Sequence, residues 1–193
     1  MKFTTKTLVT MALLSTVAFV IAAVFNLLGI APIPGTTFPI IDLKDVIIII
    51  GGFLFGVFPA VMMSLVVSLL EWFTGVSKDG FVGFIMNVIS TCSLVVVAVL
   101  IYRTKKNIVS ATIGLIAGIL VMVPTMLLWN WLIVPLYMKI PGMSVEDIRK
   151  YVETTLLLPV FLPFNLIKGS INAALAIALY KPVTLIFTKA KLN

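Results

Sequence analysis

The stretch IVSATIGLIAGILVMVPTMLLWNWLIVPLYM, residues 108–138, contains no charged side chain. An α-helix needs about 20 predominantly apolar residues to cross the hydrocarbon core of a bilayer, and this run is longer than that. The rest of the chain has the same character, since 61% of its 193 residues are hydrophobic and 11% are charged. A soluble domain has roughly 25% charged residues, which it needs to cover its surface. The sequence therefore predicts an all-α integral membrane protein.

Further apolar runs predict a single membrane domain, residues 1–193, built as a compact bundle of six transmembrane helices. The expected spans are 8–29, 43–56, 58–74, 81–102, 108–138 and 155–187. The second and third spans run together through GGFLFGVFP, residues 51–59, and their combined length favours two spans joined by a tight turn. In the last two spans, four prolines are expected to bend or break the helices, because each removes a backbone donor. These are Pro124, Pro135, Pro159 and Pro163.

The basic residues predict the orientation of the bundle. With the N-terminus inside, the inner segments hold no acid and these basic residues: Lys2, Lys6, Arg103, Lys105, Lys106, Lys181, Lys189 and Lys191. The outer loops are then expected to hold all 7 acids of the chain, including Asp42, Asp45 and Glu71, and fewer basic residues. Because short cytoplasmic loops carry the excess of Lys and Arg, both termini are expected to be cytoplasmic. The last outer loop, residues 138–151, is expected to hold a short surface helix.

A few polar residues interrupt the apolar runs. Lys168 is the one charged residue within 154–180. A lysine at the centre of a membrane helix costs about 2.5–3.5 kcal/mol, so it either has a function or extends its ammonium to the interface. No acid is expected within the spans to neutralise it. Asn165 lies on the same helical face, and Asn87 and Asn130 add amides on two other spans. These groups either hold the helices together or orient a flat, polar ligand between aromatic walls.

Several function classes lack the residues that they need. The chain has no histidine, which excludes His-based metal sites and His general bases, and its one cysteine, Cys92, is expected to be a small buried hydrophobe. No G-x-x-x-x-G-K-[ST] loop is present to bind ATP, and no relay of acids and histidines crosses the membrane to carry protons. The sequence predicts a binding protein rather than an enzyme, with no metal or cofactor, that needs partners in order to transport.

Small residues recur at a spacing of four in the first span. Ala18 and Ala22 form one pair, and Ala12 and Thr16 form an earlier one. Small residues four apart allow another helix to approach closely. The pattern fits internal packing as well as it fits contact with a partner protein.

Four segments carry a resemblance to a known family: FPIIDLKDV (38–46), GFIMNV (83–88), WNWLIVPLYM (129–138) and LPFNLIKG (162–169). With the six expected spans, the basic ends and the long first outer loop, the chain resembles the S components of energy-coupling factor (ECF) transporters over nearly its whole length. It is most similar to the riboflavin-specific ones. The last two segments are the most specific, because their Asn and Lys coincide with the intramembrane polar positions found above.

The resemblance implies a high-affinity riboflavin-binding subunit of an ECF-type ABC importer in the cell membrane of a prokaryote. Such a subunit captures the vitamin from outside and associates with a membrane T component and two cytoplasmic ATPases. The substrate-binding residues implied are Asn130, Asn165 and Lys168, with Asn87 as an addition and the loop around Thr37 and Phe38 as a cap. The residues implied to contact the T component are Ala12, Thr16, Ala18 and Ala22.

Other readings stay open from the sequence. The substrate could be another vitamin, such as folate or thiamine, and flavin mononucleotide could bind with its phosphate at the outer mouth of the site. From a different class, the chain could be a membrane assembly protein whose polar residues only hold helices together.

Overall fold

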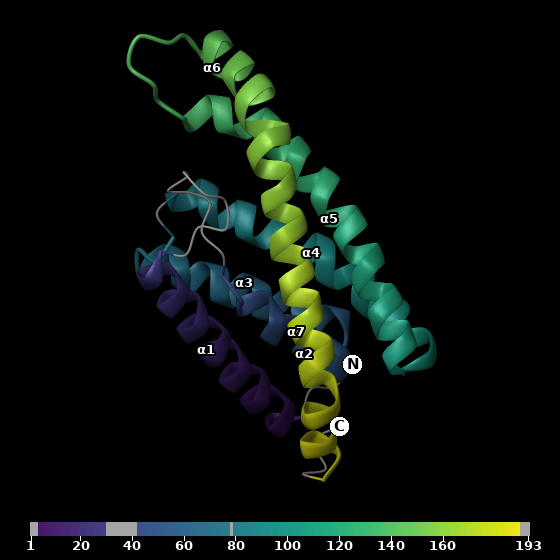
Figure 1. Ribbon diagram of the computed structural model, residues 1–193. Helices are drawn as coiled ribbons and strands as arrows, with labels where there is room; N and C mark the ends of the chain where they lie inside the picture. Colours follow the sequence, from purple (N-terminus) through teal and green to yellow (C-terminus); the bar gives the residue numbers. More distant parts are fainter. Residues whose placement is uncertain (1–3, 30–41, 78, 190–193) are drawn as a thin grey trace.

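The computed structural model describes residues 4–29, 42–77 and 79–189, with residues 184 and 186–189 described by their backbone alone. These residues form helices and no strand, so the all-α class is confirmed (Figure 1). In chain order the elements are α1 (Thr5–Leu28), α2 (Lys44–Phe55), α3 (Val57–Phe73), α4 (Gly80–Lys105), α5 (Ile108–Tyr137), α6 (Val145–Tyr151), the π-helix η1 (Val152–Phe161) and α7 (Leu162–Lys189).

Four helical stretches of the described chain are long and apolar enough to cross a membrane. They are α1, α4, α5 and the continuous stretch Val145–Val183, which contains α6, η1 and most of α7. The other two helices are shorter. At 1.5 Å per residue, the 12 residues of α2 and the 17 of α3 extend about 18 Å and 26 Å, against a hydrocarbon core of about 30 Å. The α2 helix is therefore shorter than that core is thick.

The turn between α2 and α3 occurs at one residue, Gly56. Its φ of 109° lies in a region that side-chain-bearing residues rarely adopt, so glycine is required there. Its N–H still donates to the carbonyl of Gly52 at 2.8 Å, which completes the last turn of α2. The tight turn expected within residues 51–59 is thus present, and α3 begins at Val57 directly after it.

Of the two effects expected of the prolines, bending or breaking the helices, breaking does not occur. Pro124 and Pro135 lie inside α5, which continues from Ile108 to Tyr137. Pro159 lies inside η1, whose wider turns are one way in which a helix absorbs a local disruption, and Pro163 follows in the first turn of α7.

The helix of the last outer loop is present as α6, and it runs on without a break into η1 and α7.

Close packing of α4 on α5 forms the most extensive helix contact in the bundle. Gly114 and Gly118, one turn apart on α5, lie against the backbone carbonyls of Ala98 and Leu94 on α4. A Cβ at either glycine would come within 2.5 Å of a carbonyl oxygen, so these positions need a hydrogen as side chain. On the other side of the bundle, α1 packs on α2 and α3, and α7 contacts both α2 and α5 (Figure 1).

Candidate ligand-binding site

A cavity of about 420 Å³ lies where α1, α3, α4, α5, η1 and α7 converge. Its apolar walls include Met86 of α4, Met126 of α5, and Phe161 and Phe164 at the junction of η1 and α7. The remaining lining is rich in amides and carboxylates. Such a mixture of apolar walls and a few polar groups is typical of a site for a small molecule.

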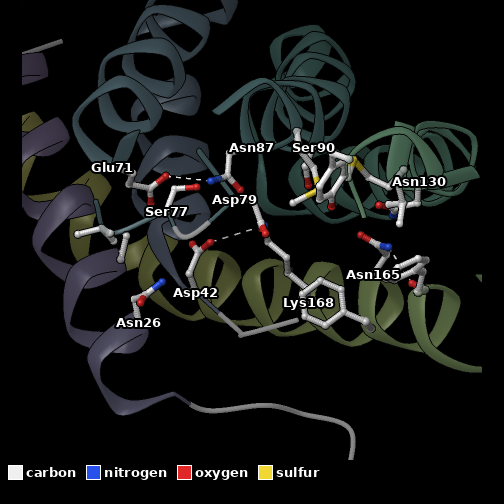
Figure 2. Close-up of a pocket in the computed structure, with 18 of the residues that line it drawn as sticks. Asn26, Asp42, Glu71, Ser77, Asp79, Asn87, Ser90, Asn130, Asn165 and Lys168 are labelled. Carbon is white, nitrogen blue, oxygen red and sulfur yellow. Dashed lines mark hydrogen bonds and ion pairs between the residues drawn. The ribbon is translucent and has the colours of Figure 1, made fainter. Parts of the chain in front are cut away.

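Four of the residues predicted from the sequence line this one cavity (Figure 2). Asn87 comes from α4, Asn130 from α5, and Asn165 and Lys168 from α7. The structure therefore brings them together from three helices, although their role in binding a substrate stays a prediction. The predicted cap around Thr37 and Phe38 lies outside the described residues.

Hydrogen bonds fix which atoms of two amides are available to a ligand. The Nδ2 of Asn165 donates to the carbonyl of Phe161 at 2.7 Å, and the Nδ2 of Asn87 donates to Glu71 Oε2 at 3.1 Å. Each side-chain amide oxygen then remains an acceptor for a ligand N–H or O–H. Asn172 is different, because it donates to the carbonyls of Lys168 and Asp42 and supports the helix rather than lining the cavity.

Lys168 is paired with acids, so the expectation of an un-neutralised lysine is wrong. Its Nζ lies 3.3 Å from Asp45 Oδ2 and 3.7 Å from Asp42 Oδ2, and 5% of the residue is exposed. The reason is the position of α2, which begins at Lys44 and turns Asp45 inward in its first turn. Glu71 likewise lies in the last turn of α3 with 3% exposed. Asp45 and Glu71 are therefore not residues of outer loops.

A second lysine completes the network. Lys44 is fully buried, and its Nζ lies 2.5 Å from Glu71 Oε2 and 3.6 Å from Asp42 Oδ2. We call these residues the buried charge cluster: Asp42, Lys44, Asp45, Glu71 and Lys168. Thr91 of α4 supports it by donating to Asp45 Oδ1 at 2.6 Å. Buried ions are stable only when paired and hydrogen-bonded, so each member depends on the others.

Sequence reasoning missed several lining residues, including Asn26, Ser77, Asp79 and Ser90. The hydroxyl of Ser90 is buried and has no hydrogen-bond partner among the described residues. Burial raises the pKa of the Asp79 carboxyl, which lies in the connection between α3 and α4. A signal for the charge cluster was present in the sequence, because the bounds of the expected spans 43–56 and 58–74 include Lys44, Asp45 and Glu71, although these acids were assigned to outer loops.

The small residues of α1 face two directions. Ala18 and Ala22 are buried, with 0% and 2% exposed, and Ala22 lines the cavity. Ala12 and Thr16 lie on the exposed face of the same helix. The later pair therefore serves internal packing, and the earlier pair alone lies on the surface. Contact with a T component stays a prediction for the residues of this motif.

Comparisons with known proteins place the chain in a family. Residues 6–180 match the family described as "ECF transporter, substrate-specific component". The chain is 28% identical over 177 residues to the riboflavin transporter RibU of Staphylococcus aureus (strain TCH60), which covers 91% of this chain and 89% of that protein. It is also similar, with a TM-score of 0.71 and 28% identity, to a solved S component of a bacterial ECF transporter, covering 94% of this chain and 97% of that one. The chain therefore belongs to the substrate-specific components of ECF transporters, which are transport proteins and not enzymes.

Proposed function

We propose that this protein is the riboflavin-binding S component of an ECF-type importer. One observation carries the proposal: the amides of Asn87, Asn130 and Asn165 and the ammonium of Lys168 converge on one cavity with methionine and phenylalanine walls. The similarity to a riboflavin transporter supports the choice of vitamin.

The chemistry of the cavity suits riboflavin. The vitamin is uncharged and combines a flat ring, which has carbonyl acceptors and one N–H donor, with a chain of hydroxyl groups. Met126, Phe161 and Phe164 offer apolar surface to the ring, while the amide oxygens of Asn87 and Asn165 accept from N–H or O–H groups. Because Lys168 is already neutralised by carboxylates, an uncharged ligand disturbs the buried charge cluster least.

We further propose a multi-pass topology of six helices in a prokaryotic cell membrane, with both termini in the cytoplasm. The first turn of α1, which carries Lys6, and the later part of α7, which carries Lys181, lie at one end of the molecule (Figure 1). The α6 helix, with acidic Glu146 and Asp147 in its first turn, lies at the opposite end. The excess of basic residues marks the cytoplasmic side.

Transport in this proposal depends on a membrane T component and two cytoplasmic ATPases. The surface proposed for the T component is the exposed face of α1 around Ala12 and Thr16. These small residues leave room for a second helix, and exposed Leu13, Val17 and Val20 surround them with apolar contact area.

The test is binding of riboflavin to the protein purified in detergent, followed by quenching of flavin fluorescence. We expect saturable quenching by the native protein. Replacing Asn130 by leucine removes a buried amide of similar size and is expected to weaken binding by at least about fivefold, because a lost hydrogen bond in a buried site costs about 1–3 kcal/mol. Thr125→Val is the control, since Thr125 is half-buried on the same helix, does not line the cavity and donates its hydroxyl to the carbonyl of Val121. A native protein that leaves flavin fluorescence unchanged would refute the proposal.

A further inference from the structure

Several polar residues of the cavity form two sets that lie apart in Figure 2, and Asn26, Asp42 and Lys168 line the cavity as well. One set, the amide end, consists of Ser90, Asn130 and Asn165. The other set, the carboxylate end, consists of Glu71, Ser77, Asp79 and Asn87. The cavity is therefore chemically asymmetric along its length, and a ligand with two different ends has a preferred direction in it.

Contacts hold the carboxylate end together. The amide of Asn87 donates to Glu71 Oε2 at 3.1 Å, and the backbone N–H of Ser77 donates to the carbonyl of Glu71 at 3.0 Å. The side chains of Ser77 and Asp79 both border the space above Gly83, so they lie close to each other. Their oxygens, with the free amide oxygen of Asn87, form a surface dominated by hydrogen-bond acceptors.

The amide end is suited to the ring of a ligand. Met126, Phe161 and Phe164 supply apolar area, and Asn165 presents an amide oxygen after its Nδ2 has bonded to Phe161. Ser90 is 3% exposed, and its hydroxyl has no partner among the residues that the structure describes. That hydroxyl has almost no surface open to the cavity, so the polar contacts available to a ligand at this end come from the amides of Asn130 and Asn165.

The described lining of the cavity offers no spare cation to an anionic ligand. Lys168 faces Asp42 and Asp45, and Lys44 faces Asp42 and Glu71, so three carboxylates surround two ammonium groups. Asp79 adds a further carboxylate and forms no ion pair with any described residue, a set that leaves out Lys78. Among the residues that the structure describes, the carboxylate end therefore carries a surplus of negative charge.

We propose that the carboxylate end receives the hydroxyl chain of the ligand and rejects a terminal phosphate, so that the site selects the uncharged vitamin over its phosphate ester. This inference rests on the proposed riboflavin function. Hydroxyl groups donate to carboxylates, and such bonds are strong. A phosphate monoester is a poor fit, because it carries about −1.5 to −2 charge at neutral pH and meets like charges where little water screens them.

The test compares the dissociation constants of riboflavin and flavin mononucleotide for the native protein, measured by fluorescence quenching in the same detergent. We expect flavin mononucleotide to bind at least about thirtyfold more weakly, as expected for like charges a few ångströms apart in a partly screened site. This comparison needs no variant. Equal affinities would overturn the inference and leave the proposed function standing, whereas the absence of quenching by either flavin would overturn both.

A variant then tests whether Asp79 causes the preference for riboflavin over flavin mononucleotide. In Asp79→Asn, the ratio of the two dissociation constants is expected to fall by at least about threefold, since one of the charges that repel the phosphate is gone. Taking the ratio removes any general effect of the substitution on flavin binding. Glu146→Gln is the matched control, because it removes a carboxylate from the exposed face of α6, and its ratio should equal that of the native protein. An unchanged ratio in Asp79→Asn would contradict the role of the carboxylate end.

Discussion

Lys168 shows how far single residues could be interpreted from the sequence. Its place in an apolar run correctly indicated a buried position, and the same reasoning gathered Asn87, Asn130 and Asn165, which line one cavity with it. Its partners were missed. Asp45 comes from the first turn of a distant helix, and a charge near the end of an apolar run is ordinarily taken for a loop residue. Ion pairs between distant helices depend on the tertiary structure, which cannot be inferred from the periodicity of a single helix.

The pairing changes the outcome expected for Lys168→Met. Removing the ammonium leaves the buried Asp45 without a cation and leaves Asp42 with Lys44 alone, and breaking a buried pair in this way costs about 3–5 kcal/mol. We expect a clear drop in the thermal unfolding midpoint in detergent as well as weaker riboflavin binding. The double variant Lys168→Met, Asp45→Asn should recover part of the stability, because it also removes one stranded charge. Native-like stability of the single variant would show that these charges are hydrated rather than buried.

At the scale of helices, some local features could be predicted from the sequence, but the contacts between helices could not. The turn at Gly56 and the helix of the last outer loop were expected. Pro124 and Pro159 were expected to bend or break their helices, and both helices continue past them, with π-helical turns around Pro159. Small residues drew attention to α1, yet the closest approach lies between Gly114 and Gly118 of α5 and the backbone of α4. Such spacing is common by chance in apolar helices, so the pattern alone could not identify the pair that is in contact.

Gly118→Val tests that contact. The added side chain would meet the carbonyl oxygen of Leu94, and overpacking of this type costs about 1–3 kcal/mol. Since α4 and α5 each supply a wall of the cavity, we expect riboflavin affinity to fall together with thermal stability. Ile116→Val, on the exposed side of the same helix, should change neither. Unaltered stability of Gly118→Val would mean that the two helices have room to separate.

At the scale of the whole molecule, the family and the all-α class could be predicted from the sequence, because composition and four short motifs already indicated them. The orientation in the membrane is a stronger claim, based on the distribution of basic residues along the chain. It places the turn after α4, with Lys105, in the cytoplasm and α6, with Glu146, outside.

Labelling of single cysteines tests this orientation. With Cys92 replaced by serine, Lys105→Cys and Glu146→Cys are each treated in intact cells with a thiol reagent that cannot cross membranes. We expect labelling at position 146 alone, and labelling at position 105 only after the cells are opened. Equal labelling of the two sites in intact cells would contradict the proposed six-helix topology.

The two faces of α1 have a mechanical consequence. Ala22 forms part of the cavity wall, while Ala12 and Thr16, on the same uninterrupted helix of 24 residues, face away from the bundle. The bound ligand and the proposed T component would thus contact opposite sides of the same helix, α1. If the exposed face of α1 binds a T component, as proposed, a change in the tilt of α1 would link the filled cavity to that partner without a separate relay.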